Sequence, residues 1–503
     1  MKLYLKGHDY KYAVEQMLLT LFPDERPEYP EQDAGGDGMR VSLSRGGKYT
    51  TACCVLRRGG GVTRGFARAA NPPAEDAVAA ERVCQRLVKN AMYRASLAAG
   101  TARPVWGALT GVRPGKLLAS MIKSGLGERD AIERFIDEYD VSRERAELCL
   151  DTTRRTLEAE RRLGGRDICL YVGVPFCPTR CAYCSFVSQS VEKSMHLLAP
   201  FVDALEREIA ATGHIVRELG LRPVAVYFGG GTPTTLSDRQ LDRVCTALED
   251  NFDLSAVREY TVEAGRPDTI TAEKLRVLKA HGADRVSVNP QTMSDAVLEA
   301  IGRRHTAADV VAALDTVRAV GGFAVNMDLI AGLPADSFAG FSDTLSSVLD
   351  LAPENITVHT LSLKKGSRIM LEGAELPAAE EVGRMLDLAG ERLRDAGYFP
   401  YYLYRQKFMS GGFENVGWSK PGHVNLYNVC IMEELCSIVA MGGGGSTKLV
   451  RRDGGRNIRF IAPKYPLEYI SGIDAVCTEK QKIREFYQDL EEQACHISSQ
   501  RSI

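Results

Sequence analysis

Residues 168 to 361 repeat one unit, in which a short apolar run is followed by a turn and then by an amphipathic stretch of helical period. The runs are rich in β-forming residues and lie at 168–174, 223–228, 259–264, 284–289, 324–330 and 355–361. Strands of continuous apolar character that alternate with helices predict a parallel sheet covered by helices. Six such units predict an α/β fold, an incomplete (β/α)6 barrel, with functional loops at the carboxyl ends of the strands. A flat, doubly wound sheet remains the structural alternative.

The segments on either side of this repeat have a different pattern. The first part begins with a strand and a helix, followed by a Gly- and Arg-rich hairpin region and further helices. The last part begins with one more helix and continues as a Tyr-, Gly- and Lys-rich region. The GGGGS stretch at 442–446 lies between apolar segments and is predicted to be a native glycine loop rather than an inserted linker. We predict an N-terminal α+β accessory domain, the barrel, and a C-terminal α+β cap that covers the substrate, over residues 1–165, 166–365 and 366–503.

The composition of the chain indicates which partners and which cellular compartment to expect. Lys plus Arg total 63 against 65 for Asp plus Glu, a net charge of −2, which argues against a nucleic-acid partner or an anionic membrane surface. The first residues mix charges with apolar side chains, so we expect no signal peptide, and no apolar run suggests a transmembrane segment. The 13 cysteines are scattered along the chain, which favours a reducing cytoplasm over a disulfide framework.

The stretch VPFCPTRCAYCSF, residues 174–186, places Cys177, Cys181 and Cys184 just after the first predicted strand. A disulfide would leave an odd thiol, and a closed zinc site would need a fourth ligand, for which His196 alone is a weak candidate. Three thiolates suit a [4Fe–4S] cluster with one iron open to an outside ligand, because ordinary electron-transfer clusters use four cysteines.

A second motif, GGGTPT at residues 229–234, follows the second predicted strand. It could be an ordinary tight turn, but three glycines without Cβ atoms also let the backbone approach a ligand and offer it N–H groups. The CxxxCxxC spacing, with Tyr183 before and Phe186 after the third cysteine, together with this glycine loop, resembles the radical S-adenosylmethionine (SAM) enzymes. That resemblance implies a [4Fe–4S] cluster and SAM as cofactors.

Longer stretches resemble one branch of these enzymes, the oxygen-independent coproporphyrinogen III oxidase family. The stretches are YVGVPFC, YFGGGTPT, TVEAGRPDTI, RVSVNPQTMSDAVLEAIGRRH, VNMDLIAGLP and, more weakly, ENVGWSKPG. The stretches WGALTGVRPGK and YYLYRQKFMSGGFENVGW resemble its HemZ-type branch, so the resemblance covers nearly the whole chain.

The resemblance also implies roles for individual residues. The cluster ligands would be Cys177, Cys181 and Cys184, and the SAM contacts would be Tyr171, Tyr183, Gly230, Gly231, Thr232, Glu263, Gln291, Arg303, Asp328 and Thr360. The carboxylates of Glu263 and Asp328 would accept hydrogen bonds from the ammonium or hydroxyl groups of SAM. Without the resemblance, the sequence fits a second interpretation equally well, in which Glu263 and Asp328 are strand-end caps and Arg303 is a solvated residue at a helix terminus.

The sequence also departs from this family. Gly173 stands where the decarboxylase branch usually has histidine, and Phe186 stands where that branch usually has a further cysteine. At both positions the chain is more similar to the heme-chaperone relatives of this family. Those relatives carry a His-Asn heme motif after the Lys-Pro-Gly sequence that corresponds to residues 420–422 here. Here Leu426, Tyr427 and Asn428 occupy that region, and His423 is nearby but out of place.

The resemblance implies oxidative decarboxylation of two coproporphyrinogen III propionates to vinyl groups, which gives protoporphyrinogen IX. It also implies an electron donor such as flavodoxin or ferredoxin. Candidate partners for a tetrapyrrole at the barrel mouth are Arg405, Lys407, Lys420, Lys448, Tyr398, Tyr401, Tyr402 and Tyr404. Two rival hypotheses stay open: a heme or tetrapyrrole carrier with a vestigial SAM site, and a radical SAM enzyme that acts on another porphyrin.

Overall fold

The computed structural model describes residues 1–32, 35–74, 76–184, 189–362, 367–406, 410–452 and 455–500. The chain divides into two compact units. Unit 1 comprises residues 1–150 together with 405–406 and 411–413, and unit 2 comprises the rest. The division falls within one helix, α5 (Arg143–Arg161).

Unit 1 is built around a small sheet with the strand order β1-β2-β3-β4. Its strands are β1 (Leu3–Lys6), β2 (Gly38–Arg45), β3 (Tyr49–Arg58) and β4 (Gly61–Ala70). Its helices are α1 (Lys11–Leu21), α2 (Ala77–Ala98), α3 (Pro114–Lys123) and α4 (Glu128–Tyr139). Helix α2 packs on β3 and β4, and the Asp76 carboxylate caps it by accepting from the Ala79 N–H. The predicted first strand, first helix and hairpin region are confirmed.

Unit 2 contains the six strands that the apolar runs predict, paired side by side and parallel. They are β5 (Asp167–Val174), β8 (Arg222–Gly230), β9 (Tyr260–Glu263), β10 (Arg285–Ser287), β11 (Ala324–Ala331) and β12 (Asn355–Thr360). Two short strands, β6 (Phe176–Cys177) and β7 (Gln189–Ser190), pair apart from this sheet.

The sheet extends beyond these six strands at both edges. Strand β15 (Ser437–Gly442) adds to β5 in parallel, and β16 (Ser446–Leu449) and β17 (Ile458–Ile461) follow it in antiparallel pairing. At the other edge, β14 (Asn415–Ser419) and β13 (Phe399–Tyr404) pair antiparallel. In the described part of the chain the order runs from β13 to β17 without closing, so the incomplete barrel is confirmed. The GGGGS stretch connects β15 to β16, as the native-loop prediction requires.

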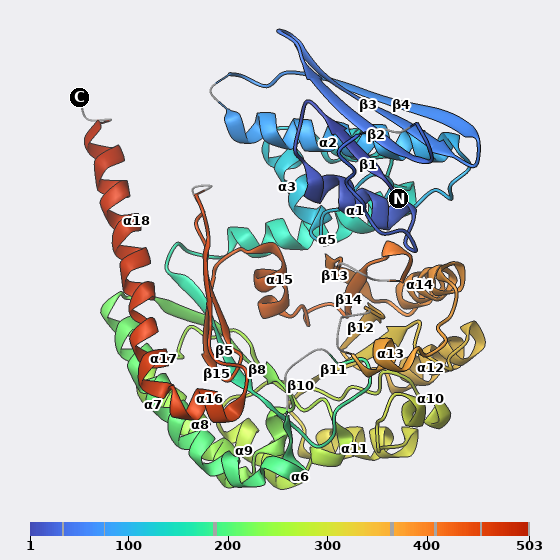
Figure 1. Cartoon of the computed structure of the whole chain (residues 1–503). Coiled ribbons are helices and arrows are strands. Elements are labelled where there is room, and N and C mark those ends of the chain that lie inside the picture. The colour runs from blue at the N-terminus through green and yellow to red at the C-terminus, as the bar shows by residue number, and fades with distance from the viewer. Residues whose placement is uncertain are drawn as a thin grey trace. The chain divides into compact units, whose positions relative to one another are not determined.

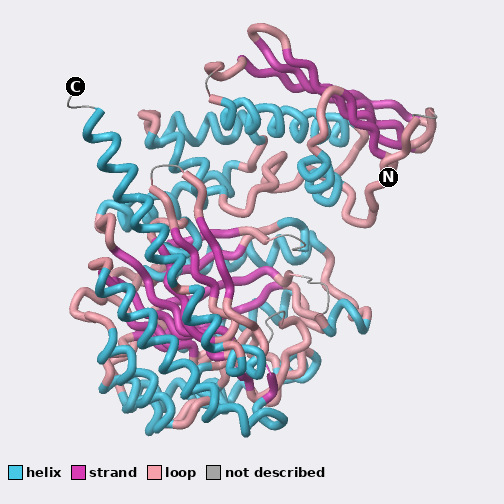
Figure 2. Tube along the Cα trace, turned by 60° about the vertical axis from the view of Figure 1, so that its left-hand side comes forward, coloured by secondary structure: helices cyan, strands magenta, loops and turns pink. Residues whose placement is uncertain are grey.

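Helices follow the parallel strands and lie along the outer side of the curved sheet (Figures 1 and 2). They are α7 (Leu198–Glu218), α8 (Asp238–Asn251), α9 (Ala272–Ala280), α11 (Ala307–Val320) and α12 (Phe338–Leu351). The other helices are α6 (Val191–Ser194), α10 (Asp295–Ala300), α13 (Arg368–Glu372), α14 (Ala379–Asp395), α15 (Leu426–Glu433), α16 (Pro466–Ser471), α17 (Ile473–Glu479) and α18 (Gln481–Gln500). Ser237 and Gln240 form a capping box that starts α8.

The two faces of β5 show how the sequence positions the site. Ile168, Leu170 and Val172 belong to the core between the sheet and its outer helices. Cys169 and Tyr171 alternate with them and join a second cluster, which includes Tyr427 of α15. The inner face of the sheet is therefore packed with aromatic and thiol side chains rather than left as an open channel.

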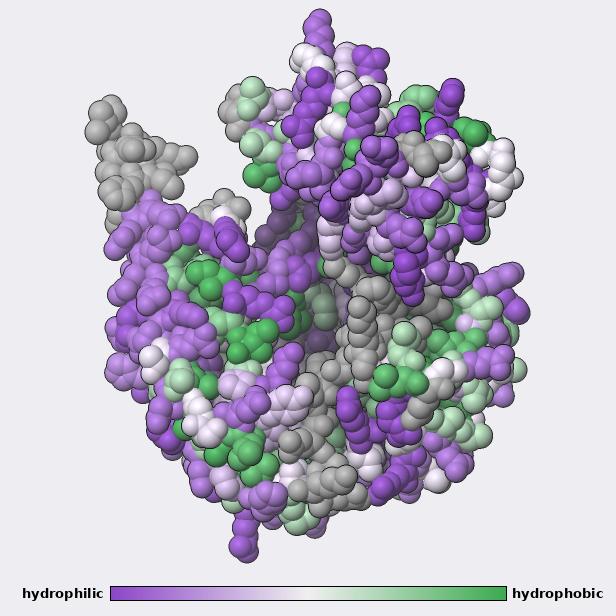
Figure 3. Space-filling view, viewed as in Figure 1, coloured by the Kyte–Doolittle hydropathy of each residue, from purple (hydrophilic) through white to green (hydrophobic). Residues whose placement is uncertain are grey.

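Hydrophilic side chains cover most of the face seen in Figure 3, and hydrophobic ones form small, separate patches. Within the described residues, every helix is too short or too polar to cross a membrane.

Candidate functional site

The cysteine motif lies directly after β5, at the carboxyl edge of the parallel strands. Cys177 ends β6, and Cys181 and Cys184 follow in a loop; all three are half-buried. The Ala182 N–H donates to the Ile301 carbonyl at 2.9 Å, which ties this loop to the end of α10. Phe186 lies outside the described residues.

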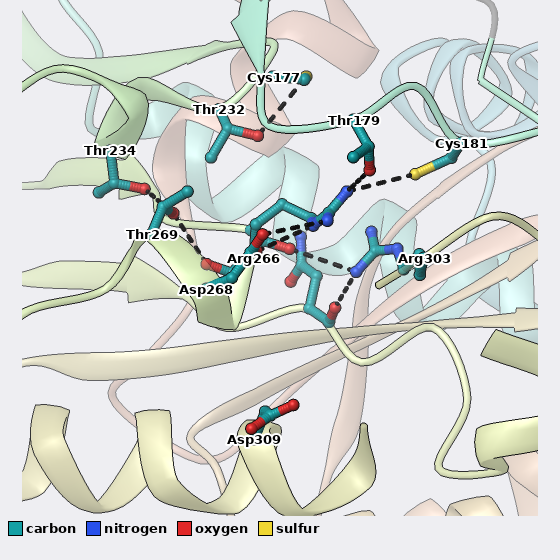
Figure 4. A network of polar contacts seen from close by, with 12 residues as sticks. Cys177, Thr179, Cys181, Thr232, Thr234, Arg266, Asp268, Thr269, Arg303 and Asp309 are labelled. Atoms are coloured by element: carbon teal, nitrogen blue, oxygen red, sulfur yellow. Dashed lines mark hydrogen bonds and ion pairs between the residues drawn. The ribbon is translucent and has the colours of Figure 1, made fainter. Parts of the chain in front are cut away.

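The sulfurs of Cys177 and Cys181 have polar partners in neighbouring loops (Figure 4). The Thr232 hydroxyl donates to Cys177 Sγ at 3.6 Å, and Arg266 Nη1 lies 4.0 Å from Cys181 Sγ. Arg266 also donates to the Thr179 hydroxyl at 2.9 Å and pairs with Asp268 at 3.2 Å. The sequence reasoning missed Arg266, although its position three residues after Glu263, at a strand end, could have marked it.

Arg303 is a second buried cation near Cys181. Its Nη1 donates to the Asn289 carbonyl at 2.6 Å, and its Nη2 donates to the Tyr183 hydroxyl at 3.1 Å. Its Nε is buried and has no hydrogen-bond partner among the described residues. Interactions with the Tyr183 and Cys181 side chains outweigh burial and raise the pKa of Arg303. Two guanidiniums near one cysteine sulfur therefore fit a site that holds excess negative charge, as a thiolate-bound iron–sulfur cluster does.

His305 is another buried group that the sequence reasoning did not single out. Neither of its ring nitrogens has a hydrogen-bond partner in the described part of the chain. Burial and the charges of Arg303 and Arg266 lower its pKa to about 4, so the imidazole is neutral at pH 7.

The glycine loop lies beside the cysteine loop. Gly231 donates its N–H to the Val174 carbonyl at 2.8 Å, and a Cβ on Gly231 would lie 2.3 Å from the Phe176 carbonyl oxygen. Gly230 has φ +102°, a backbone conformation that favours glycine. A Cβ on Gly229 would lie within 3.3 Å of Tyr171, Tyr227 and Glu263. The glycines thus create a cradle in which small side chains would collide with their neighbours.

Two carboxyl groups, Glu263 on β9 and Asp328 on β11, have opposite pKa shifts. Burial raises the pKa of Glu263 to about 7, against the hydrogen bond at 2.5 Å that Tyr227 donates to it. Burial also acts to raise the pKa of Asp328. Interactions with His359 and a 2.8 Å hydrogen bond from Asn326 outweigh burial, so the pKa of Asp328 is lowered overall. Asp328 is therefore an anion at pH 7, whereas Glu263 titrates near that pH.

Three tyrosine rings stack below this cradle. The Tyr227 and Tyr427 rings have centroids 4.2 Å apart, and Tyr171 lies 6.1 Å from Tyr427. Tyr427 comes from α15, whose first residues are held by Glu259: its carboxylate accepts from the Leu426 N–H at 2.5 Å and the Tyr427 N–H at 3.3 Å. Helix α15 therefore supplies an aromatic floor to the site.

The other predicted contacts are placed as follows. Gln291 has φ +67° and bridges to β11, where its N–H donates to the Asp328 carbonyl at 2.9 Å. The Thr360 hydroxyl donates to the Glu414 carbonyl at 2.7 Å, which fixes this side chain at the end of β12. The structure places Tyr183, Thr232, Glu263 and Thr360 at or beyond the carboxyl ends of the strands, whereas Tyr171 and Asp328 lie within β5 and β11.

Close packing explains why a glycine occupies position 173 in this chain. A Cβ at this position would lie 2.9 Å from the Gly443 carbonyl oxygen, and a Cβ on Gly442 would lie 2.2 Å from the Gly173 oxygen. The glycine loop after β15 therefore packs directly on the strand that leads to Cys177, and it occupies space that a larger residue at 173 would need.

Several residues that the sequence suggests as tetrapyrrole partners lie away from the cysteine loop. Lys420 donates to the Ala352 carbonyl at 2.7 Å, before β12, and Tyr398 donates to the Pro353 carbonyl at 2.5 Å, so both lie at the amino end of this strand. Lys448 pairs with Glu434. In unit 1, Arg405 donates to the carbonyls of Leu109 and Gly412. Lys407 lies outside the described residues. The prediction that Lys420 and Tyr398 lie at the barrel mouth is wrong. Lys420 follows β14, which runs antiparallel to β12, and Tyr398 precedes β13, which runs in the same direction as β12, so both lie at the amino end of β12.

An open, helix-covered parallel sheet with a three-cysteine loop and a glycine loop at its carboxyl end defines a radical SAM protein. The family model of the radical SAM superfamily matches residues 171–348. The solved coproporphyrinogen III oxidase (HemN) of Escherichia coli shares the fold, with a TM-score of 0.50 and 23% identity over 63% of this chain and 72% of that one.

Sequence relatives narrow the family. The oxygen-independent coproporphyrinogen-III oxidase-like protein HemZ of Bacillus subtilis is 39% identical over 385 residues, 76% of this chain and 77% of that protein. The heme chaperone HemW of the same organism is 31% identical over 253 residues, 49% of this chain and 64% of that protein. The chain therefore belongs to the HemZ-like family of radical SAM proteins. This superfamily uses a [4Fe–4S] cluster and SAM, the two cofactors that the cysteine and glycine motifs predict.

Proposed function

We propose that this chain is a radical SAM oxidoreductase that decarboxylates the propionate side chains of coproporphyrinogen III, with Cys177, Cys181 and Cys184 as cluster ligands. The observation that carries the proposal is the arrangement of site charges at one end of the sheet. Buried cations lie beside Cys181, and two carboxyls, Glu263 and Asp328, lie on β9 and β11, the two strands on either side of β10. The name of the HemZ relative, an oxidase-like protein, supports the choice of substrate.

Each charge has a partner in the proposed complex. Arg266 and Arg303 offset the negative charge of a thiolate-ligated cluster. Asp328, ionised at pH 7, accepts from hydroxyl groups of SAM, and Glu263 accepts from its ammonium group. When bound, the reduced cluster and SAM would supply the radical that removes a hydrogen atom from the propionate side chain. Loss of CO₂ then forms the vinyl group and releases one electron, which an external one-electron acceptor must take up. The chain's own residues orient the cofactor, and the tyrosine floor keeps water from the site.

The test is an anaerobic assay of the reconstituted protein with SAM, a strong reductant and coproporphyrinogen III, followed by mass spectrometry. Stepwise loss of carboxylates matched by 5′-deoxyadenosine supports the proposal. Deoxyadenosine with an unchanged tetrapyrrole overturns the substrate assignment and leaves a radical SAM enzyme with another substrate. In a parallel arm, flavodoxin or ferredoxin replaces the chemical reductant, since the proposal needs a one-electron donor.

A second candidate function, tetrapyrrole carriage, rests on a separate cavity. A cavity of about 990 Å³ lies at the amino ends of the strands, away from the cysteine loop. Arg155, Arg258, Arg285 and His423 line it, together with apolar residues that include Phe399. Guanidiniums suit propionates, and imidazole is a heme ligand.

Heme titration of the wild-type chain and of His423→Ala separates the two functions. A heme absorption spectrum that depends on His423, combined with no decarboxylation, favours the carrier. Heme binding that is unchanged in His423→Ala, or absent in both, removes this candidate.

A further inference from the structure

Three cysteines outside the cluster motif meet inside the sheet. Cys169 lies on β5, Cys430 on α15, and Cys436 just before β15. Their sulfur atoms all lie within 4.8 Å of one another, and the Cys169 and Cys436 sulfurs are 3.6 Å apart. All three side chains are at most 3% exposed. We call these residues the buried thiol trio.

The spacing of the trio matches one metal ion. Zinc–sulfur bonds of about 2.3 Å in tetrahedral geometry place neighbouring sulfurs about 3.8 Å apart. A [4Fe–4S] cluster attaches each cysteine to a different iron, which separates its cysteine sulfurs more widely. In the described part of the chain, Cys177, Cys181 and Cys184 do not form a group with sulfurs within 4.8 Å of one another. The cluster motif and the trio therefore suit different occupants.

From this geometry we propose that the buried thiol trio binds a single thiophilic d10 cation, Zn²⁺ or Cu⁺. Thiolate sulfur selects soft cations over Mg²⁺ or Ca²⁺, which prefer oxygen. Arg452 donates to the carbonyls of Leu435 and Leu163 at 3.1 Å, so a positive charge lies next to the Cys436 segment and offsets thiolate charge. The ordinary alternative is three thiols that pack as small hydrophobic side chains and contact one another.

A cation here would join three segments that are far apart in the sequence. It would link β5, α15 and β15 below the Tyr171–Tyr427 ring pair. Metal binding to a site that forms only on folding stabilises the folded chain. The ion would therefore fix the aromatic floor of the SAM site without contacting SAM.

The test measures metal content in the full chain with Cys177, Cys181 and Cys184 all replaced by Ala, so that the cluster motif binds nothing. This background is purified and then incubated without oxygen, with reductant and with Zn²⁺ or Cu⁺ alone. Elemental analysis is expected to find one cation per chain after washing, and to identify which of the two it is. Cys169→Ala, Cys430→Ala or Cys436→Ala, added singly, is expected to remove it. The matched control is Cys245→Ala, because Cys245 is an equally buried thiol that lies outside the trio and accepts a hydrogen bond from the Tyr260 hydroxyl at 3.4 Å. This control is expected to keep the cation.

A second measurement does not depend on the folding of the variants. X-ray absorption at the metal edge in the background chain is expected to report three sulfur ligands at about 2.3 Å. The melting temperature should also rise with metal concentration in the background and not in the three variants. Substoichiometric metal after loading, a metal environment of nitrogen and oxygen, or retention of metal in the three variants would overturn the proposal. A disulfide between any two of the trio in the reduced protein would overturn it as well.

Discussion

Gly229 lies where the second parallel strand meets the side chains of Tyr171, Tyr227 and Glu263. An added Cβ would lie 3.1 Å from Tyr227 Cε1, 3.2 Å from Tyr171 Cε2 and 3.3 Å from the Glu263 carboxyl carbon. These contacts are tighter than ordinary packing, so Gly229→Ala should displace the Tyr227–Glu263 pair. We expect SAM affinity to fall about tenfold, the effect of roughly 1.4 kcal/mol. Isothermal titration calorimetry measures it, and Gly165→Ala is the control because nothing lies within 4 Å of its added Cβ. Unchanged affinity in Gly229→Ala would show that the cradle does not hold SAM.

Arg266 acts on the reacting centre through charge. Its side chain is only 3% exposed, and its Nη1 lies 4.0 Å from Cys181 Sγ. A buried positive charge stabilises the reduced, more negative form of a thiolate-bound cluster. Arg266→Gln should therefore lower the midpoint potential of the cluster while leaving its iron content unchanged. A redox titration followed by electron paramagnetic resonance measures this shift, with the exposed pair residue Arg276→Gln as the control. An unchanged midpoint potential in Arg266→Gln would show that Arg266 stabilises the loop and does not affect the charge of the cluster.

At the scale of the element, α15 depends on one buried carboxyl. Glu259 is 4% exposed and accepts from the N–H groups of Leu426 and Tyr427. Burial raises its pKa to about 7, against the opposing charge of Arg285. The folded chain therefore binds more protons than the unfolded chain between pH 4.5 and 7. The stability that Glu259 contributes is full below pH 4.5 and is lost as the pH rises through 7.

This linkage predicts the effect of Glu259→Gln. The amide keeps an oxygen acceptor for α15 but does not titrate, so the variant should lose less stability than wild type between pH 5 and pH 8. The difference has an upper limit of about 3 kcal/mol. Calorimetric unfolding at the two pH values measures it, and the exposed Glu299→Gln should behave as wild type. Equal pH dependence in Glu259→Gln and wild type would contradict the raised pKa.

The elements were predictable from the sequence to a large extent. All six apolar runs became parallel strands, because a buried strand leaves a continuous apolar signal of fixed length. The apolar run at 437–442 became β15, but its pairing with β5 was not predictable, since 262 residues lie between the two strands and no local sequence pattern indicates which strand pairs with which. The same limit applies to the buried thiol trio. Each of its cysteines reads as an ordinary core residue until the sheet order brings Cys169 beside Cys436.

Site residues were predictable where a motif carries the chemistry and not where tertiary packing does. The cysteine and glycine loops are contiguous, so their residue types alone indicate a cluster and a close backbone approach. His305 carries no such local signal, and Arg266 carries only its position just after a strand end, because the importance of both residues comes from burial next to Cys181 and Arg303. The prediction that Lys420 lies at the barrel mouth rested on its charge, which the sequence shows. It failed because the sequence does not show that β14 runs antiparallel to β12.

At the scale of the whole molecule, the cluster loop and the folding core are separate. The main core of unit 2 is formed by the parallel strands and the outer helices, and Cys177, Cys181 and Cys184 do not belong to it. All three cysteines are half-buried in a loop at the edge of the sheet. Replacing them with Ala should therefore remove bound iron and SAM cleavage but leave the fold intact, with a melting temperature within about 4 °C of the apo wild type.

Iron analysis, circular dichroism and calorimetry of the Cys177→Ala, Cys181→Ala, Cys184→Ala chain check this expectation. The comparison must use apo wild type, since a bound cluster would itself stabilise the folded chain by mass action. Phe176, which immediately precedes the first cysteine, is fully buried, so Phe176→Ala serves as the opposite control. It should cost about 3–5 kcal/mol by leaving a cavity in the core, while the three cysteines stay in place. A triple variant that unfolds as readily as Phe176→Ala would mean that the cysteine loop organises the barrel, and the core would then depend on the site rather than support it.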